Sequence, residues 1–182
     1  MTLNYKRTFF IGLAFLSISA FWQVYDSLIP LMLQTSFHLK DTIIGTIMAA
    51  DNVLALFMLP LFGTISDKTN TKIGKRMPFI LAGTALSVVF MLIIPVAGTN
   101  GNLILFIVSL GIVLLSMGMY RSPAVALMPD FTPKVLRSKA NAVISLMGTV
   151  GGIFALVAIR FLVPHETNPS YEPVFVSVAI VM

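Results

Sequence analysis

The sequence predicts an all-α membrane protein, and two observations carry this prediction: the composition and the grouping of the apolar residues. Of the 182 residues, 57% are hydrophobic and only 10% are charged, and the mean hydropathy is +0.95. An ordinary soluble domain has about 25% charged residues. So few charges cannot cover the surface of a water-soluble globule, which excludes a soluble domain and makes lipid the main solvent of the chain.

The apolar residues fall into six runs, and we expect each to be helical because lipid offers the backbone no hydrogen-bond partner. A membrane crossing needs about 20 apolar residues. The predicted spans are residues 8–33, 43–65, 78–96, 103–126 and 142–163, with a sixth at 174–182. At about 1.5 Å of rise per residue, the sixth run covers only about 14 Å. We therefore expect a truncated helix and a chain that is part of a longer protein.

Local signals support individual helices. The first run is too long for a cleaved signal peptide. The third begins at Pro78, which suits the first turn of a helix, and the short turn at 97–102 (AGTNGN) makes the third and fourth runs antiparallel. The fifth contains Gly148, Gly151 and Gly152, and the Gly-x-x-x-Gly spacing of 148 and 152 favours close helix packing.

Basic residues are distributed unequally between the two sides of the predicted membrane. One side has only Lys40 and Arg160. The other side has Lys6, Arg7, Lys68, Lys72, Lys75, Arg76, Arg121, Lys134, Arg137 and Lys139. This bias predicts a cytoplasmic amino terminus. The net charge of +5 is thus explained by topology rather than by nucleic-acid binding, and the same residues can contact lipid headgroups.

The loop after the second run has an ordered pattern of glycine, acidic and basic residues, GTISDKTNTKIGKRMPF from residue 63 to residue 79. A merely positive inner loop would need no particular order. The pattern resembles the loop 2-3 signature of the major facilitator superfamily, G-x-x-x-D-[RK] followed by G-[RK]-[RK], with four extra residues between the halves. This expanded form is similar to the glycoside-pentoside-hexuronide cation symporters and the sucrose/proton symporters. The resemblance implies a gating role for Gly63, Asp67, Lys68, Gly74, Lys75 and Arg76.

A second stretch, RSPAVALMPD at 121–130 followed by RSKAN from residue 137, is similar to the end of helix 4 and loop 4-5 in the sucrose-transporter-like branch. It adds Asp130 and Arg137 to the implied gating residues. Transporters of this superfamily have twelve helices in two six-helix halves. The resemblance therefore implies the amino-terminal six-helix half of the major facilitator superfamily fold, with helix 6 truncated and the carboxy-terminal half, a required partner, absent.

Two positions depart from relatives of this kind. Melibiose-type symporters have paired Asp residues where this chain has Ala55 and Leu59, so a sodium site of that type is not expected. Plant sucrose symporters have an Arg at the position of Val125, whereas this chain has Arg121 one helical turn earlier. The fifth run also lacks the proline that drug/proton antiporters place there, which weakens an exporter interpretation.

Polar residues within the apolar runs are candidates for function because they are costly in lipid. On the first run, the spacing of Phe15, Ser19, Trp22 and Asp26 places them on one helix face. With the adjacent Gln23, and Asn52 of the second run, this composition suits a sugar, whose ring packs on an aromatic side chain and whose hydroxyls bind carboxylates and amides. The substrate-binding prediction is Trp22, Gln23, Asp26 and Asn52. Alternatively, Trp22 belongs to an interfacial aromatic belt or serves helix packing, and Asp26 forms an interhelical hydrogen bond or is a charge in the outer vestibule.

Asp51 and Arg121 are the predicted proton-coupling pair. Asp51 lies inside the second run, where a carboxylate that loses hydration can bind a proton. Arg121 could also neutralise an anionic substrate, or extend its charge to the membrane surface; Arg160 is expected to do the latter. The alternative for Asp51 is an interhelical hydrogen bond or a charge in the outer vestibule.

Together these observations predict a proton-coupled symporter of a sugar or glycoside that works by alternating access in the cell membrane. The alternatives are an exporter of drugs or organic acids, and a non-transporting membrane sensor. We expect no enzyme, because the chain lacks a His-centred dyad, a phosphate-binding glycine loop and a metal-ligand cluster. No cofactor, metal or nucleic acid is expected. The expected partners are the small-molecule substrate, the proton, membrane lipid and the carboxy-terminal half.

Overall fold

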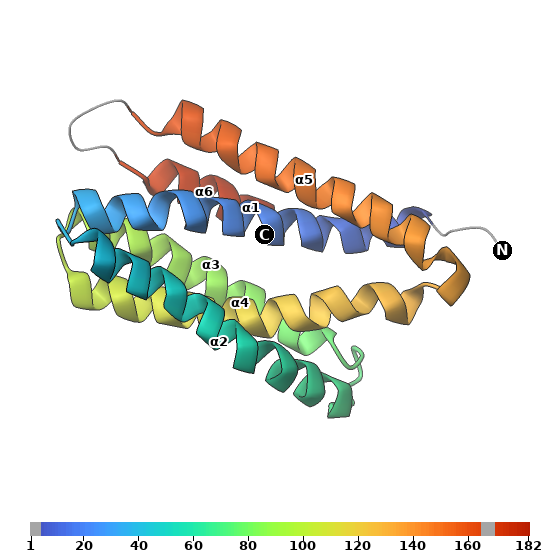
Figure 1. The fold of residues 1–182 in the computed structure, drawn as a ribbon. Helices are drawn as coiled ribbons and strands as arrows, with labels where there is room; N and C mark the ends of the chain where they lie inside the picture. The colour runs from blue at the N-terminus through green and yellow to red at the C-terminus, as the bar shows by residue number, and fades with distance from the viewer. Residues whose placement is uncertain (1–4, 165–169) are drawn as a thin grey trace.

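A computed structural model of the chain describes residues 5–164 and 170–182, and these residues form a bundle of helices (Figure 1). The helices are α1 (Tyr5–Thr35), α2 (Asp41–Lys68), α3 (Met77–Thr99), α4 (Leu103–Phe131), the short 3-10 helix η1 (Lys134–Leu136), α5 (Arg137–Leu162) and α6 (Glu172–Val181). Within the described ranges there is no strand. Among them, α1 to α5 are long and apolar enough to cross a membrane, and α6 is a shorter apolar helix. The predicted all-α membrane fold is confirmed.

Each predicted span overlaps one helix, but the helices are longer than the spans. The largest differences are at α4, which continues five residues beyond 126 to Phe131, and at α5, which begins at Arg137 rather than 142. A hydropathy pattern detects only the part of a helix that lies in lipid. The turn that contains Pro129 and Asp130 at the end of α4, and the polar turn at the start of α5, extend those helices past that part.

The bundle has a basic end and an opposite end. The basic end holds the start of α1 and the α2–α3 and α4–α5 connections, and the opposite end holds the α1–α2 and α3–α4 connections, the end of α5 and the start of α6 (Figure 1). Along the bundle, α1 packs on α5 and α3 packs on α4, while α2 packs on α4 and α6 contacts α3, α5 and α1.

The core lies toward the opposite end. Fully buried side chains there include Tyr25, Leu28 and Met32 of α1, Phe106 of α4 and Phe175 of α6. The first turns of α1, at the basic end, expose large apolar side chains instead. Large apolar side chains are therefore buried toward one end of the bundle and exposed on the first turns of α1 at the other.

Helices α1 and α5 approach each other closely at a glycine of α5. A Cβ added at Gly151 would lie 2.1 Å from the carbonyl oxygen of Leu16. At Gly148 an added Cβ would lie 3.0 Å from the hydroxyl oxygen of Ser19, and at Gly152 the nearest atom, in Gln23, is 3.9 Å away. Close packing by this glycine-rich helix was expected, but its centre is Gly151 rather than the Gly-x-x-x-Gly pair, whose members face a cavity.

We therefore predict that Gly151→Ala lowers the free energy of unfolding by about 2 kcal/mol, because two helix backbones must move apart. The matched control is Gly111→Ala in α4, where an added Cβ meets nothing within 4 Å and alanine is the better helix former. Thermal unfolding of the purified protein in detergent measures both. Equal transition temperatures for the two variants would contradict the close approach.

Candidate functional site

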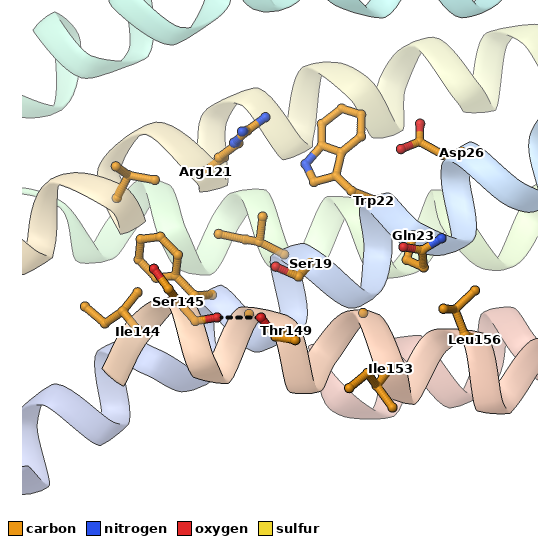
Figure 2. A pocket seen from close by; sticks show the side chains of 15 residues that line it. Ser19, Trp22, Gln23, Asp26, Arg121, Ile144, Ser145, Thr149, Ile153 and Leu156 are labelled. Atoms are coloured by element: carbon orange, nitrogen blue, oxygen red, sulfur yellow. Dashed lines mark hydrogen bonds between the residues drawn. The ribbon is translucent and has the colours of Figure 1, made fainter. Parts of the chain in front are cut away.

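A cavity of about 710 Å³ lies between α1, α4 and α5 (Figure 2). The predicted face of α1 lines it, with Phe15, Ser19, Trp22 and Asp26 all at its wall together with Gln23. The volume is in the range of small-molecule binding sites, which is about 300–1,000 Å³. Three of the four residues predicted to bind substrate, Trp22, Gln23 and Asp26, are thus brought together at one cavity.

Helix α5 supplies a polar wall that sequence reasoning missed. Ser145 and Thr149 line the cavity beside Gly148 and Gly152, and the Thr149 hydroxyl donates to the Ser145 carbonyl oxygen at 3.1 Å (Figure 2). Small and hydroxyl residues recur here at intervals of three and four residues in an otherwise apolar helix. This spacing could have predicted the polar wall from the sequence, because it places these residues on one helix face.

Arg121 of α4 reaches the same cavity and packs on an aromatic ring. Its guanidinium carbon is 5.5 Å from the centre of the Trp22 ring, within the range of a cation–π contact. The Trp22 ring makes edge-on contacts with Phe21 and Tyr25, at 5.5 and 5.3 Å between ring centres. Arg121 forms no ion pair with a carboxylate in the described part of the chain.

A second, much smaller cavity of about 20 Å³ lies between α1, α2 and α4. Asp51 lines it, and this side chain is buried, with 8% of the residue exposed. Trp22 and Arg121 line both cavities. The predicted coupling pair, Asp51 and Arg121, therefore shares one cavity, although the two side chains are not in an ion pair.

Asn52 is placed differently from the other predicted substrate residues. It is exposed and lines neither of these two cavities. Its side-chain amide donates to the Asp51 carboxylate at 2.9 Å. The structure therefore connects Asn52 to Asp51, the carboxylate predicted to bind the proton, rather than to the large cavity.

A polar contact joins α1 to α4 on the basic-end side of Trp22. A buried hydrogen bond of 2.7 Å links the hydroxyls of Ser17 and Tyr120, and the Tyr120 hydroxyl also donates to the Ala14 carbonyl oxygen at 3.1 Å. This contact fixes the spacing of the two helices that carry Trp22 and Arg121. Sequence reasoning did not find it, because isolated Ser and Tyr residues in apolar helices give no pattern.

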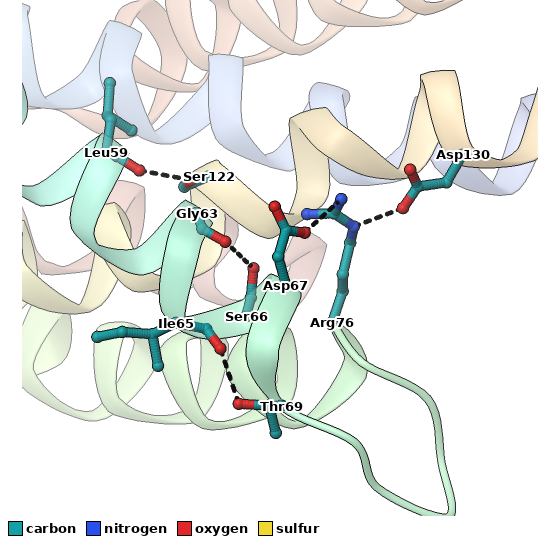
Figure 3. Close-up of polar contacts among 9 residues, drawn as sticks. All are labelled: Leu59, Gly63, Ile65, Ser66, Asp67, Thr69, Arg76, Ser122 and Asp130. Carbon is teal, nitrogen blue, oxygen red and sulfur yellow. Dashed lines mark hydrogen bonds and ion pairs between the residues drawn. The ribbon is translucent and has the colours of Figure 1, made fainter.

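At the basic end, Arg76 bridges two carboxylates (Figure 3). Its Nη2 atom lies 2.9 Å from Asp67 at the end of α2, and its Nε atom donates to Asp130 near the end of α4 at 2.6 Å. The Arg76 side chain is 12% exposed, against 60% for Asp67 and 49% for Asp130. The largely buried Arg76 guanidinium is shared by both carboxylates. It therefore joins the end of α2, the start of α3 and the end of α4 at one point. The structure thus brings together three of the predicted gating residues.

The remaining predicted gating residues lie around this cluster. Gly74 has φ +108°, a left-handed conformation that favours glycine, and it turns the chain just before Arg76. An added Cβ at Gly63 would lie 3.2 Å from the Ser122 hydroxyl oxygen, and that hydroxyl donates to the Leu59 carbonyl oxygen at 2.8 Å, which brings α2 and α4 together (Figure 3).

The other basic residues of the predicted gate make no ion pair within the described ranges. Lys68 and Lys75 are exposed. Arg137 donates to the carbonyl oxygens of Pro129 and Thr132, at 3.1 and 3.3 Å. It therefore holds the final turn of α4, which carries Asp130, rather than pairing with a carboxylate.

Five helices long and apolar enough to cross a membrane indicate a multi-pass membrane protein, and comparison with known proteins identifies its class. Residues 11–182 match the sequence profile of the Major Facilitator Superfamily, and the chain belongs to this superfamily of transporters. It is accordingly a multi-pass membrane protein, and proteins of its family bind small-molecule substrates.

The name of one similar protein includes a substrate. The chain is similar to the sucrose transport protein SUC3 of Arabidopsis thaliana, with 26% identity over 156 residues, which cover 75% of this chain and 26% of the relative. The chain thus spans about a quarter of the length of this relative. No solved structure matches it significantly.

Proposed function

We propose that the protein containing this chain is a secondary active transporter that couples proton movement to symport of a sugar or glycoside across the cell membrane. The observation that carries the proposal is the cavity of about 710 Å³, which combines an indole ring with carboxylate, amide, guanidinium and hydroxyl groups. Sugars present an apolar ring face and several hydroxyls, and this lining offers a partner to each. The similarity to a sucrose transport protein supports the same class of substrate.

In this proposal, the substrate lies against Trp22, Gln23 and Asp26 of α1, with Ser145 and Thr149 of α5 opposite. Asn52 acts indirectly, since its amide fixes the orientation of the Asp51 carboxylate. Asp51 binds the coupled proton, because a buried carboxylate in a low-dielectric site gains most from neutralisation.

We further propose that the chain forms the amino-terminal half of the transporter and that a carboxy-terminal half closes the cavity. Alternating access in this superfamily requires two halves that rock around a central site. Substrate and proton together permit the rocking, whereas either ligand alone does not, and this condition prevents leakage of the gradient.

The amino terminus and the basic end are proposed to be cytoplasmic, because ten of the twelve basic residues lie on that side. These 182 residues contain no cysteine, so Asn70→Cys introduces the one thiol among them, in the α2–α3 connection, and the parent protein is the labelling control. A membrane-impermeant maleimide should label this thiol only after the cells are permeabilised. Labelling in intact cells would show that this end of the bundle faces the outside.

The two carboxylates are predicted to have separable roles. Asp51→Asn should abolish accumulation of sugar against a gradient while sparing sugar exchange, because exchange needs no net proton movement. Asp26→Asn should instead weaken sugar affinity about tenfold, which is the expected cost of losing a hydrogen bond to a charged group. Uptake and counterflow into vesicles that contain the complete protein measure both. If Asp51→Asn accumulates sugar with the pH dependence of the parent, the proton is carried elsewhere.

The Arg76 cluster is predicted to hold the basic end closed. Asp67→Asn removes one of its two ion pairs, which is worth about 1 kcal/mol at such exposure, so the population should shift about fivefold toward the state open at that end. Maximal uptake should fall while sugar affinity changes little. Asp41→Asn, at the other end of α2, is the matched control. Unchanged uptake kinetics in Asp67→Asn would contradict the gating role of the Arg76 cluster.

A further inference from the structure

Trp22 and Arg121 are the two residues that line both cavities, and they contact each other. The indole ring and the guanidinium group therefore form the wall between the large cavity, which contains Asp26, and the small cavity, which contains Asp51. An occupant of the large cavity can therefore influence Asp51 by displacing this contact.

The charged and titratable groups around this wall come from three helices. Helix α1 contributes Asp26 and the phenol of Tyr25, α2 contributes Asp51, and α4 contributes Arg121. The cavity-lining residues of α5 are uncharged. Arg121 is thus the one cation that lines either cavity, and two carboxylates are available to it.

Arg121 nevertheless pairs with neither carboxylate in the described part of the chain. Attraction between opposite charges is strong in a poorly hydrated interior, and a competing contact can hold the guanidinium group away from the carboxylates. The Trp22 ring offers that contact at 5.5 Å. The ring is itself held by Phe21 and Tyr25, and its buried Nε1 atom has no hydrogen-bond partner among the described residues. Packing and the contact with Arg121, rather than a hydrogen bond, therefore set its orientation.

We propose that Trp22 is a positioning residue for proton coupling, which holds Arg121 on its ring and so keeps Asp51 free to bind a proton. This inference rests on the proposed function of the same site, and it gives Trp22 a role beyond contact with the sugar. Without the ring, Arg121 pairs with Asp51, which lines the same small cavity and is the more buried carboxylate. The ion pair then stabilises the charged form of Asp51.

The two possible roles of Trp22 predict different measurements. Loss of the positioning role makes Asp51 protonate at a lower pH, by about one pH unit, because a paired cation favours the ionised carboxylate. Loss of a sugar contact alone weakens sugar binding and leaves the protonation of Asp51 unchanged. The pH at which Asp51 is half protonated, measured without sugar, therefore separates the two roles.

The experiment is infrared titration of the complete protein in lipid, with the carboxyl band of Asp51 assigned by its loss in Asp51→Asn. Trp22→Leu should lower the midpoint by about one pH unit, whereas Trp22→Phe, which keeps an aromatic face, should retain the parental midpoint. Phe15→Leu is the matched control, since Phe15 lines the large cavity but not the small one. Trp22→Met offers the same comparison if Trp22→Leu does not fold.

A double-variant comparison tests whether Arg121 is the cation that shifts the midpoint of Asp51. In an Arg121→Gln background, Trp22→Leu should leave the midpoint where Arg121→Gln alone places it. The proposal is overturned by an unchanged or raised midpoint in Trp22→Leu, by a shift that persists without Arg121, or by the absence of any titration of Asp51. Failure of the proposed sugar symport would appear separately, as sugar uptake that does not respond to a proton gradient while the titration shifts as expected.

Discussion

The approach of α1 to α5 at Gly151 is the constraint on which the candidate site depends. Since an added Cβ there would lie 2.1 Å from the Leu16 carbonyl oxygen, α1 is held tightly against α5. Helix α4 is packed on α3 instead, and near the site it is joined to α1 by the buried Ser17–Tyr120 hydrogen bond. The large cavity lies where α1 and α4 belong to different helix pairs. Small residues and isolated polar contacts provide such packing in lipid, where the hydrophobic effect does not drive helices together.

The charges of the chain are arranged in two separate groups with different exposure. Asp26, Asp51 and Arg121 are at the central cavities, where ionised groups are costly. Asp67, Arg76 and Asp130 form a bridged cluster at the basic end, with largely exposed carboxylates. Unpaired charges near the centre are free to respond to a ligand, whereas paired charges at the end can be broken and remade as helix ends move. This division agrees with a transporter in which binding and gating are separated along the membrane normal.

Sequence reasoning predicted the features that depend on one helix or on one ordered motif. The helical spans and the shared face of Trp22 and Asp26 followed from apolar runs and from residue spacing, and the pairing of Asp67 near Arg76 followed from the resemblance of the loop. It missed features that depend on how a helix is rotated against its neighbour. These include the polar wall at Thr149, the Ser17–Tyr120 contact, the exposed position of Asn52, and the choice of Gly151 over Gly148 as the point of closest packing.

The central claim is that sugar movement and proton movement are obligatorily linked through this cavity. Simultaneous recording of external pH and labelled sucrose entry, in vesicles that contain the complete protein, tests it most directly. The account predicts that addition of sucrose makes the external medium more alkaline in fixed proportion to sugar entry, and that Asp51→Asn abolishes the pH change while sugar exchange continues. Sucrose entry with no accompanying proton uptake, or proton-driven export, would contradict the account.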